Sequence, residues 1–398
     1  MAPRSFDVIV FGATGFTGGL VAEYLARQTG VRWAIAGRDR ARLEAVRARL
    51  KLELPIVIAD ARDGASLRAL AAQTKVVATT AGPFALHGDE LVAACVEQGT
   101  HYCDLSGEMQ WIARMIARHH EAAQRTGARI VNACGYDSLP SDLGVFVLQQ
   151  HALSTLGQPA TEIAALAYAR GPNLSGGTFA SMFNIAEEAG RDKKVRRLLF
   201  DPHGLAADPK ALTGSKAEQH GVGYVEGVFT APFLMGPGNV RIVHRSNSLL
   251  DYRYGRDFVY DEAMPTGKGV GGALAAGALT ALLSTLMVGV GLPPVRALLK
   301  RVVPKPGTGP SEKARQGSSF SHELYGVVGG KHVRARFAAK GDPGYGETAK
   351  MIGESALTLA FDELPSGGGV LTGASAMGDA LVARLRKAGF TIEAWIEG

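Results

Sequence analysis

At the start of the chain, an apolar run of strand length is followed by a group of glycines and then by apolar positions at helical spacing. Residues 6–11 read F-D-V-I-V-F, an apolar run of strand length. The turn G-A-T-G-F-T-G follows at residues 12–18, and apolar positions then recur at helical spacing over residues 20–26. This order of buried strand, glycine turn and helix predicts a dinucleotide site at the turn. The alternative is an ordinary strand, turn and helix whose glycines serve packing alone.

Strands and helices continue to alternate through the first third of the chain. The pattern predicts strands at residues 33–36, 55–59, 75–80, 101–105 and, as the last of the sheet, 129–134. It predicts helices at residues 40–50, 66–73, 89–98 and 108–125. Strands joined by helical crossovers form a parallel sheet, so we expect an α/β, doubly wound Rossmann domain over residues 1–140.

The glycine turn supplies the first candidates for cofactor binding. Gly12 can take the tight turn, Gly15 can let the backbone approach a pyrophosphate, and Gly18 can let the helix pack on the strand. The N-terminus of the helix offers free N–H groups to phosphates. The spacing G-x-x-G-x-x-G is a variant typical of NADP-linked reductases. The candidates in this turn are Gly12, Thr14, Gly15, Phe16, Thr17 and Gly18.

The ends of the next strands indicate which dinucleotide binds. Arg38 is the first charged residue after the second strand, where an arginine accommodates a 2′-phosphate and a carboxylate would favour NAD. Asp39 lies one position further on, and we expect it to cap the following helix. Arg38 therefore favours NADP(H), against the alternative of a solvated surface charge. Asp60 is placed to bind the adenine amino group, and the loop Ala81, Gly82 and Pro83 to hold the second phosphate and ribose.

Past about residue 140 the apolar positions alternate with polar ones. The alternation covers residues 164–168, 240–244, 320–324 and 333–337. These runs predict strands of a mostly antiparallel sheet, with a hairpin turn at Gly329-Gly330 and a helix at residues 178–190. We expect an α+β substrate domain over residues 141–344 that covers the nicotinamide side of the cofactor. Residues 345–398 would form C-terminal helices, at 345–359 and 378–387, that can return to the Rossmann domain.

One segment of the second domain differs from the rest. No charged residue occurs from Gly269 to Val295, a length sufficient to span a bilayer core, which takes about 20 apolar residues. Six glycines between residues 269 and 291 make it weakly hydrophobic, and basic residues follow from Arg296 onward. Three interpretations stay open: a buried or lipid-lining helical hairpin, contact with a membrane surface or another copy, and a transmembrane helix. Residues 304–319 are expected to form a mobile loop.

Composition excludes several classes of function. The chain has 398 residues, of which 46% are hydrophobic and 20% charged, as in a folded protein of two or three domains. Its net charge of +6 comes from scattered residues, so nucleic-acid binding has little support. The spacing of Cys95, Cys103 and Cys134 fits neither a metal site nor a redox pair. With no apolar signal region at the N-terminus, we expect a cytoplasmic protein.

These motifs together resemble the saccharopine dehydrogenase-like oxidoreductases. The resemblance rests on the glycine turn, Ala36-Gly37-Arg38, Ala81 to Phe84, Tyr102 to Glu108 and Cys134 to Asp142. Within that family the chain is most similar to trans-acting enoyl reductases that serve polyketide synthases. Residues 241–247, 304–311 and 369–379 carry this finer likeness, although Gly373 stands where that branch usually has proline.

The resemblance implies an NADP(H)-dependent reductase of lipid biosynthesis. Its substrate would be a long-chain acyl or polyketide intermediate, held on an acyl carrier protein and reduced at its enoyl double bond. Contact of residues 269–303 with the inner face of a membrane, and formation of a homodimer, are further expectations about partners.

A reductase of this kind needs a proton donor and a partner for the enolate oxygen. We expect the nicotinamide near Gly82-Pro83 and the loop from Gly135 to Asp142, where Tyr136, Asp137 and Ser138 are the catalytic candidates. Tyr102 and Asp104 are weaker candidates, and capping of the next helix by Ser141 or Asp142 is the structural alternative. No Tyr-x-x-x-Lys or Ser/His/Asp arrangement occurs, so a hydroxyl-activating dehydrogenase lacks its residues.

Two other functions stay open. A saccharopine-type imine oxidoreductase would need arginines converging on the nicotinamide to bind carboxylates. This alternative stays open because the second domain contains four candidate arginines, Arg241, Arg245, Arg253 and Arg256. A cofactor-binding protein of lipid surfaces, without catalysis, is the non-enzymatic alternative, since no strong catalytic acid is evident.

Overall fold

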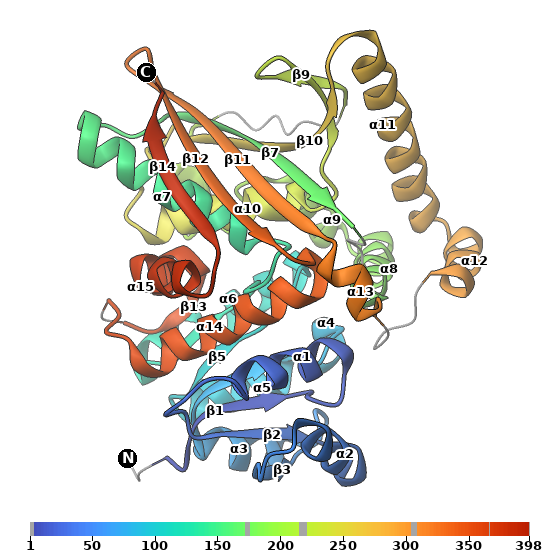
Figure 1. Cartoon of the computed structure of the whole chain (residues 1–398), viewed down its shortest axis with the longest axis vertical. Helices are drawn as coiled ribbons and strands as arrows, with labels where there is room; N and C mark the ends of the chain where they lie inside the picture. Colours follow the sequence, from blue (N-terminus) through green and yellow to red (C-terminus); the bar gives the residue numbers. More distant parts are fainter. Residues whose placement is uncertain (1–3, 172–175, 215–220, 304–308, 366, 398) are drawn as a thin grey trace.

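The computed structural model describes residues 4–171, 176–214, 221–303, 309–365 and 367–397. Two seven-stranded sheets form separate layers with helices between and around them (Figure 1). The first sheet is parallel throughout, and the second is mostly antiparallel. This confirms the predicted fold class of a Rossmann sheet joined to an α+β domain.

The parallel sheet has the order β13-β6-β5-β4-β1-β2-β3. Its strands are β1 (Phe6–Phe11), β2 (Trp33–Gly37), β3 (Ile56–Ile58), β4 (Thr74–Thr79), β5 (His101–Cys103), β6 (Arg129–Val131) and β13 (Gly369–Leu371). The crossover helices are α1 (Phe16–Leu25), α2 (Arg40–Leu50), α3 (Gly64–Ala72), α5 (Asp89–Glu97) and α6 (Met109–Thr126), with the short α4 (Phe84–His87) before α5. The prediction that residues 129–134 form the last strand is wrong, because β13 pairs with β6 from the far end of the chain.

The order of the sheet reverses between β1 and β4. The chain builds β1, β2 and β3 to one side and then returns to place β4 on the other side of β1. The carboxyl ends of β1 and β4 lie together, and the backbone N–H of Thr80 donates to the carbonyl of Phe11 (3.2 Å). Ligands of doubly wound sheets bind in the crevice at such a reversal.

The second sheet has the order β14-β12-β11-β7-β10-β9-β8, in which only β7 and β10 pair in parallel. Its strands are β7 (Glu162–Arg170), β8 (Gly223–Val225), β9 (Val228–Pro232), β10 (Val259–Gly267), β11 (Ser319–Val328), β12 (Lys331–Lys340) and β14 (Thr391–Ile396). Gly329 and Gly330 both have positive φ, of 55° and 80°, and form the predicted hairpin turn between β11 and β12.

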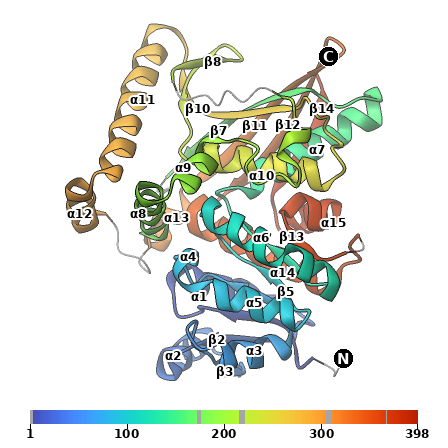
Figure 2. The ribbon, with the colours of Figure 1, turned by 180° about the vertical axis from the view of Figure 1, so that it is seen from behind.

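Helices fill the space between the two sheets (Figure 2). They are α7 (Leu139–Leu156), α10 (Gly236–Leu249), α14 (Thr348–Phe361) and α15 (Gly373–Lys387). The strand predicted at residues 240–244 is wrong, because these residues lie in α10. Every residue from Asn239 to Ser248 is buried, so the alternation of Val240, Ile242 and His244 did not mark one exposed face. Pro237 in the first turn of the helix supports the helical start.

The last part of the chain supplies elements to both layers. A π-helical turn at Pro343–Glu347 precedes α14, which packs on α1 and β4, and β14 forms an edge of the antiparallel sheet beside β12. Residues 345–398 therefore hold two strands as well as the predicted helices. The division into domains at residues 140 and 344 stays a prediction.

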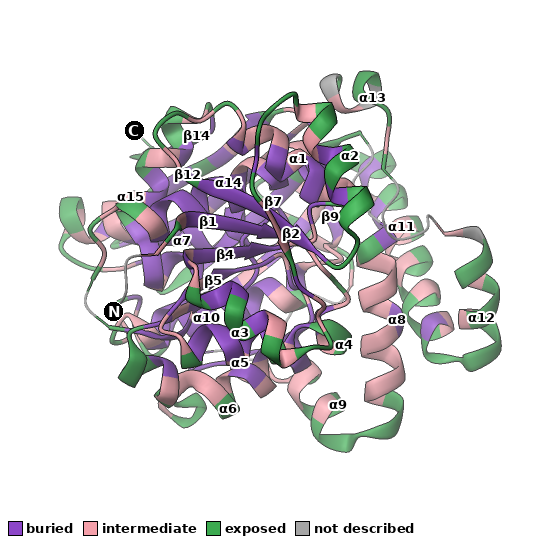
Figure 3. Cartoon of the chain, turned by 90° about the horizontal axis from the view of Figure 1, so that it is seen from below, coloured by how far each residue is buried: buried purple, intermediate pink, exposed green. Residues whose placement is uncertain are grey.

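The uncharged segment forms α11 (Gly269–Gly291), followed by α12 (Pro293–Val302) at the side of the molecule (Figures 1 and 2). Figure 3 shows mainly exposed and intermediate residues here, against the buried centre of the sheets. Among the described residues, α11 is the one helix long and apolar enough to cross a membrane by length and composition. Only Gly272, Ala276 and Val290 of α11 are buried, so the interpretation of the segment as a buried hairpin is wrong, while a lipid-lining helix, a surface contact and a transmembrane helix stay predictions. The predicted loop at 304–319 contains α13 (Glu312–Gln316), and its residues 304–308 lie outside the described residues.

Candidate functional site

A cavity of about 1070 Å³ lies between the two layers, at the carboxyl ends of β1 and β4. The glycine turn, the loop after β4 and the loop between β6 and α7 line one part of it. The other part is lined by α8 (Gly176–Arg191), the end of α9 (Lys193–Phe200), residues 232–239 and the second half of α11. Only Asp137 and Arg196 carry charge among the described lining residues, so the wall is largely apolar.

The glycine turn has the geometry that a dinucleotide site requires. Gly12 has a φ of +85°, and its carbonyl accepts from the N–H of Gly15 (3.0 Å). A Cβ atom on Gly18 would lie 2.2 Å from that same carbonyl oxygen, so only glycine lets α1 pack this close. No side chain caps α1 at Gly15, and its first turn holds no acidic residue. The helix N-terminus is thus open to an anion, and all six candidates of this turn line the cavity.

The loop after β4 is held by one buried carboxylate that the sequence analysis did not single out as functional. Ala81, Gly82 and Pro83 line the cavity, and their contact with the second phosphate and ribose of a cofactor stays a prediction. Glu108 is fully buried and accepts from the backbone N–H groups of Phe84 (2.7 Å) and Ala85 (3.3 Å). It also accepts from two α8 side chains, the Ser181 hydroxyl (3.1 Å) and the Asn184 amide (3.3 Å). The sequence signal that could have identified Glu108 is its position in the run Ser106-Gly107-Glu108, as an acidic residue directly before a helix.

Arg38 and Asp60 lie outside the cavity, after β2 and β3. Arg38 is exposed, and Asp39 caps α2 as predicted by accepting from the Arg42 N–H (3.1 Å). The backbone N–H of Arg62 lowers the pKa of Asp60, and the charge of Arg38 contributes to the same shift. The two candidates are therefore neighbours at the edge of the sheet. Their contacts with the adenosine part of a cofactor stay a prediction.

Tyr102 and Asp104, the weaker catalytic candidates, do not line the cavity. Asp104 is fully buried and accepts from Tyr102, Asn132 and the backbone N–H groups of Ser106 and Ala133, at 2.8 to 3.0 Å. Desolvation raises the pKa of its carboxyl to about 6. Ala133 has a φ of +61°, in the left-handed region. Asp104 thus holds the strained start of the loop that carries the three stronger candidates.

Tyr136 lies against the second sheet. Its ring contacts Phe320 and His322 of β11, with centroids 4.9 and 5.6 Å apart. Its hydroxyl is buried and makes no hydrogen bond with the described part of the chain, and desolvation raises its pKa. Its backbone N–H donates to the hydroxyl of Thr348 (3.0 Å). Tyr136 therefore lines the cavity with its other atoms while its hydroxyl is covered.

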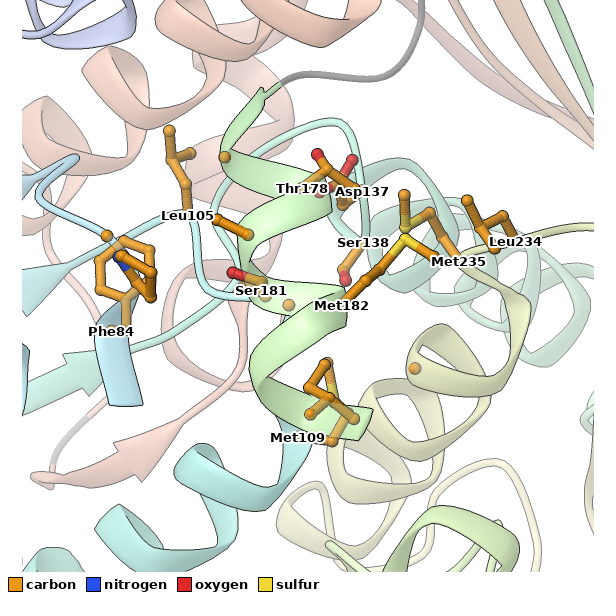
Figure 4. A pocket seen from close by; sticks show the side chains of 18 of the residues that line it. Phe84, Leu105, Met109, Asp137, Ser138, Thr178, Ser181, Met182, Leu234 and Met235 are labelled. Atoms are coloured by element: carbon orange, nitrogen blue, oxygen red, sulfur yellow. The ribbon is translucent and has the colours of Figure 1, made fainter. Parts of the chain in front are cut away.

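Asp137 and Ser138 border the same space as Thr178 and Met182 of α8 (Figure 4). Asp137 keeps part of its surface accessible, where it faces the cavity, and accepts no hydrogen bond from the described residues. Desolvation alone raises the pKa of its carboxyl to about 6. Ser138 directly precedes α7 and makes no side-chain cap bond to it. An acid and a hydroxyl that are consecutive in the sequence thus both border the cavity that the loop of residues 81–83 also lines.

Asp142 and Ser141, the predicted helix caps, bond elsewhere. The Asp142 carboxylate accepts from the hydroxyl of Ser246 and from the N–H of Ala374 (2.8 Å). The Ser141 hydroxyl donates to Glu262 (2.7 Å), which also accepts from Asn239 (2.5 Å). These bonds join α7 to α10, β10 and α15, so the predicted capping role is wrong and a tertiary role replaces it.

The arginines that supported an imine oxidoreductase do not converge on the cavity. The buried Arg241 donates to the carbonyls of Leu198 (3.0 Å), Leu199 and Pro237. The buried Arg245 donates to the carbonyls of Leu205 (2.7 Å) and Val370. Arg253 and Arg256 are exposed, and none of the four lines the cavity. The guanidinium groups of Arg241 and Arg245 thus join backbone segments, and none of the four arginines is placed in the cavity to bind the carboxylates of an imine substrate.

Comparisons with known proteins agree with this geometry. Residues 8–131 match the family described as "Saccharopine dehydrogenase NADP binding domain". A Mycobacterium ulcerans protein named "Trans-acting enoyl reductase" is 40% identical, over 99% of this chain and 98% of that one. A Mycobacterium tuberculosis protein that bears this name provisionally is 43% identical, over 98% of each chain.

The fold has a solved counterpart. Saccharopine dehydrogenase (L-Glu forming) from Saccharomyces cerevisiae superposes with a TM-score of 0.58, covers 99% of this chain and 100% of its own, and is 12% identical. At this identity the likeness concerns the fold alone. The glycine turn fits the cofactor that the family binds, because its helix N-terminus is open and its glycines leave room for a diphosphate. The chain therefore belongs to the saccharopine dehydrogenase-like oxidoreductases, in the branch of the trans-acting enoyl reductases, and is an NADP-dependent enzyme.

Proposed function

We propose that the protein uses NADPH to reduce the enoyl double bond of a long-chain acyl or polyketide thioester, presented on an acyl carrier protein. The observation that supports this most is the continuous cavity at the carboxyl ends of β1 and β4. It joins the glycine turn to an apolar wall made by Phe233, Leu234 and Met235 and by the α11 side chains Leu283 and Met287. A long apolar chain would be buried there, which stabilises binding by about 0.8 kcal/mol per CH₂ group.

The candidate residues divide the chemistry among them. Bound NADPH supplies the hydride that adds to the β-carbon. We propose that the Ser138 hydroxyl donates a hydrogen bond to the thioester oxygen as negative charge develops on it. The Asp137 carboxyl, protonated below a pKa of about 6, would deliver the proton to the α-carbon. Tyr136 would position this loop through its contacts with β11, since its hydroxyl is covered.

NADPH oxidation tests the reaction. The assay compares trans-2-enoyl thioesters of increasing chain length with 2-oxoglutarate plus lysine, the amino-acid alternative. We expect turnover with the thioesters and a KM that falls as the chain lengthens. Turnover with the amino-acid substrates alone would reverse the assignment. Absence of turnover with every thioester, carrier supplied, would favour a cofactor-binding protein without catalysis.

A second proposal concerns the outer face of α11 and α12. We propose that this face rests on the inner surface of a membrane while the rest of the protein stays in the cytoplasm. Val270, Leu274 and Val288 are 68–78% exposed, and Lys300 and Arg301 follow on α12. No acidic residue occurs from 269 to 303. Exposed apolar side chains beside basic ones suit an interface of anionic lipids.

Deletion of residues 269–303 tests this surface. A membrane contact predicts that the deleted protein leaves the membrane fraction while it still binds NADPH. Unchanged fractionation with lost turnover of long thioesters would show that α11 serves the cavity alone. A shift from dimer to monomer in sedimentation would assign the face to a second copy instead. Circular dichroism of the variant confirms that it is folded.

A further inference from the structure

Helix α9 carries four cations without acidic partners. Lys193, Lys194, Arg196 and Arg197 are exposed, and none forms an ion pair within the described part of the chain. The nearby acids of α8 are already paired. Glu187 bonds Arg191 (2.8 Å) and Glu188 bonds Arg114 (2.7 Å). Asp192 and Asp201, which flank α9, accept hydrogen bonds from the backbone N–H groups of Lys194 and His203. The four cations of α9 therefore outnumber the acids beside them and keep their side chains free of ion pairs among the described residues.

The helix is held firmly against the cavity. The buried Arg241 donates to the last carbonyls of α9, at Leu198 and Leu199, and the Leu198 carbonyl also accepts the N–H of Asp201 (3.2 Å). Leu198 and Leu199 pack on the core of the parallel sheet. A positive side chain at a helix C-terminus also stabilises the helix dipole. A buried arginine thus fixes a cationic helix in place.

One of the four cations reaches the cavity itself. Arg196 lines it together with Leu199 and Phe200, and Phe200 is 79% exposed. Because Arg196 and Phe200 face both solvent and cavity, this end of α9 forms a mouth of the cavity. Arg196 is the one cation among the described lining residues. An anion bound there would lie at the entrance to an otherwise apolar space.

We infer that α9 binds the phosphate of a phosphopantetheine arm, with Arg196 as its principal ligand. The inference rests on the proposed function. A thioester reduced inside the cavity is attached to an arm whose phosphate must stay near the mouth. Guanidinium pairs with phosphate through two parallel hydrogen bonds, so Arg196 suits this group. Lys193, Lys194 and Arg197 would attract the acidic surface of a carrier protein.

Three thioesters of one enoyl chain test the site. The enoyl chain is attached in turn to three thiols. The N-acetylcysteamine thioester has no phosphate, and the phosphopantetheine thioester has the phosphate but no protein. The thioester of a holo-carrier protein has both the phosphate and a protein surface. For R196Q we expect the KM of the two phosphate-bearing thioesters to rise about tenfold, while the KM of the N-acetylcysteamine thioester changes little. A tenfold change corresponds to about 1.4 kcal/mol of binding free energy. The double variant K193E/K194E should raise the KM of the carrier-bound thioester alone, most at low salt.

The control is R191Q, on α8, whose guanidinium is paired with Glu187 and lies outside the cavity. It should leave the ratios of KM unchanged. An equal change for all three thioesters in R196Q would overturn the inference, since Arg196 would then only shape the cavity. If K193E/K194E instead releases the protein from anionic vesicles and leaves carrier-bound turnover intact, α9 is a lipid contact.

Failure of the proposed function gives a different result. In that case wild-type protein turns over none of the three thioesters. Titration with holo-carrier protein lacking an acyl group then decides the inference separately. Binding that R196Q weakens about tenfold supports the site, and binding that R196Q leaves unchanged overturns it.

Discussion

The carboxylate of Glu108 accepts a 2.7 Å hydrogen bond from the backbone N–H of Phe84, at the end of the loop that follows β4. The same carboxylate accepts from Ser181 and Asn184 of α8. One buried side chain therefore joins the loop proposed for the cofactor to α8, which lines another part of the cavity. This loop and α8 cannot move apart without breaking these bonds.

E108Q tests this link. The glutamine lacks the negative charge, which weakens the four hydrogen bonds that Glu108 accepts. Its NH₂ group also replaces one carboxylate oxygen and is a donor where the neighbouring groups donate as well. We expect a loss of about 1–3 kcal/mol in the free energy of unfolding and weaker binding of NADPH. Denaturant unfolding and fluorescence titration measure the two effects. The control E187Q alters a half-buried acid of α8 that pairs with Arg191 and does not bond the loop after β4. Equal behaviour of the two variants would contradict the role of Glu108.

G18A tests the close packing of α1 on β1. The new Cβ would lie 2.2 Å from the carbonyl oxygen of Gly12, so the helix must shift at the phosphate site. Such overpacking costs about 1–3 kcal/mol, and we expect NADPH binding to fall at least tenfold. G271A, in α11, is the control, because a Cβ there has no neighbour within 4 Å. Calorimetry measures the affinity of the folded G18A protein for NADPH. An affinity equal to that of wild type would contradict the prediction.

R38A tests the preference for NADP(H) over NAD(H). Losing the guanidinium removes the proposed partner of the 2′-phosphate, so we expect the Kd for NADPH to rise at least tenfold, about 1.4 kcal/mol. The Kd for NADH, which lacks that phosphate, should change little. Nicotinamide fluorescence measures both. R40A is the matched control, because Arg40 lies 3.9 Å from Glu44 on the exposed side of α2. If R38A weakened the binding of NADPH and of NADH by the same factor, Arg38 would have a structural role instead.

D137N tests the buried acid through its pH dependence. The pKa of Asp137 is about 6 in the folded protein and 3.8 in the unfolded one, so ionisation destabilises the fold as pH rises from about 4 through 6. The variant lacks this cost. It should therefore be more stable than wild type at pH 8, by up to about 3 kcal/mol, and equal to it near pH 4.

Activity supplies the second measurement on the same group. If Asp137 donates the proton, kcat of wild type falls as pH rises above about 6, and D137N loses that dependence together with most of its turnover. Melting curves at pH 4 and pH 8 accompany the rate profile. D39N, which alters an exposed helix cap, is the control. A D137N enzyme with the wild-type rate profile would remove Asp137 from the reaction.

Local patterns in the sequence determined the Rossmann half of this protein. A strand, a glycine turn and a helix specify each other within about twenty residues, so the cofactor turn and the cap at Asp39 were predictable. The hairpin at Gly329-Gly330 was predictable for the same reason, because positive φ at two consecutive residues is a local requirement of the turn.

Tertiary structure decided the features that depend on distant partners. Residues 240–244 alternate in hydrophobicity, yet α10 is buried on all sides and periodicity then carries no information. Strand β13 joins β6 across more than 230 residues, which no local pattern records. The arginines of α10 bind backbone carbonyls, and Arg196 reaches the cavity on a helix whose end Arg241 bonds and whose leucines pack on the core. Composition shows which groups are available, and the fold alone decides which groups meet.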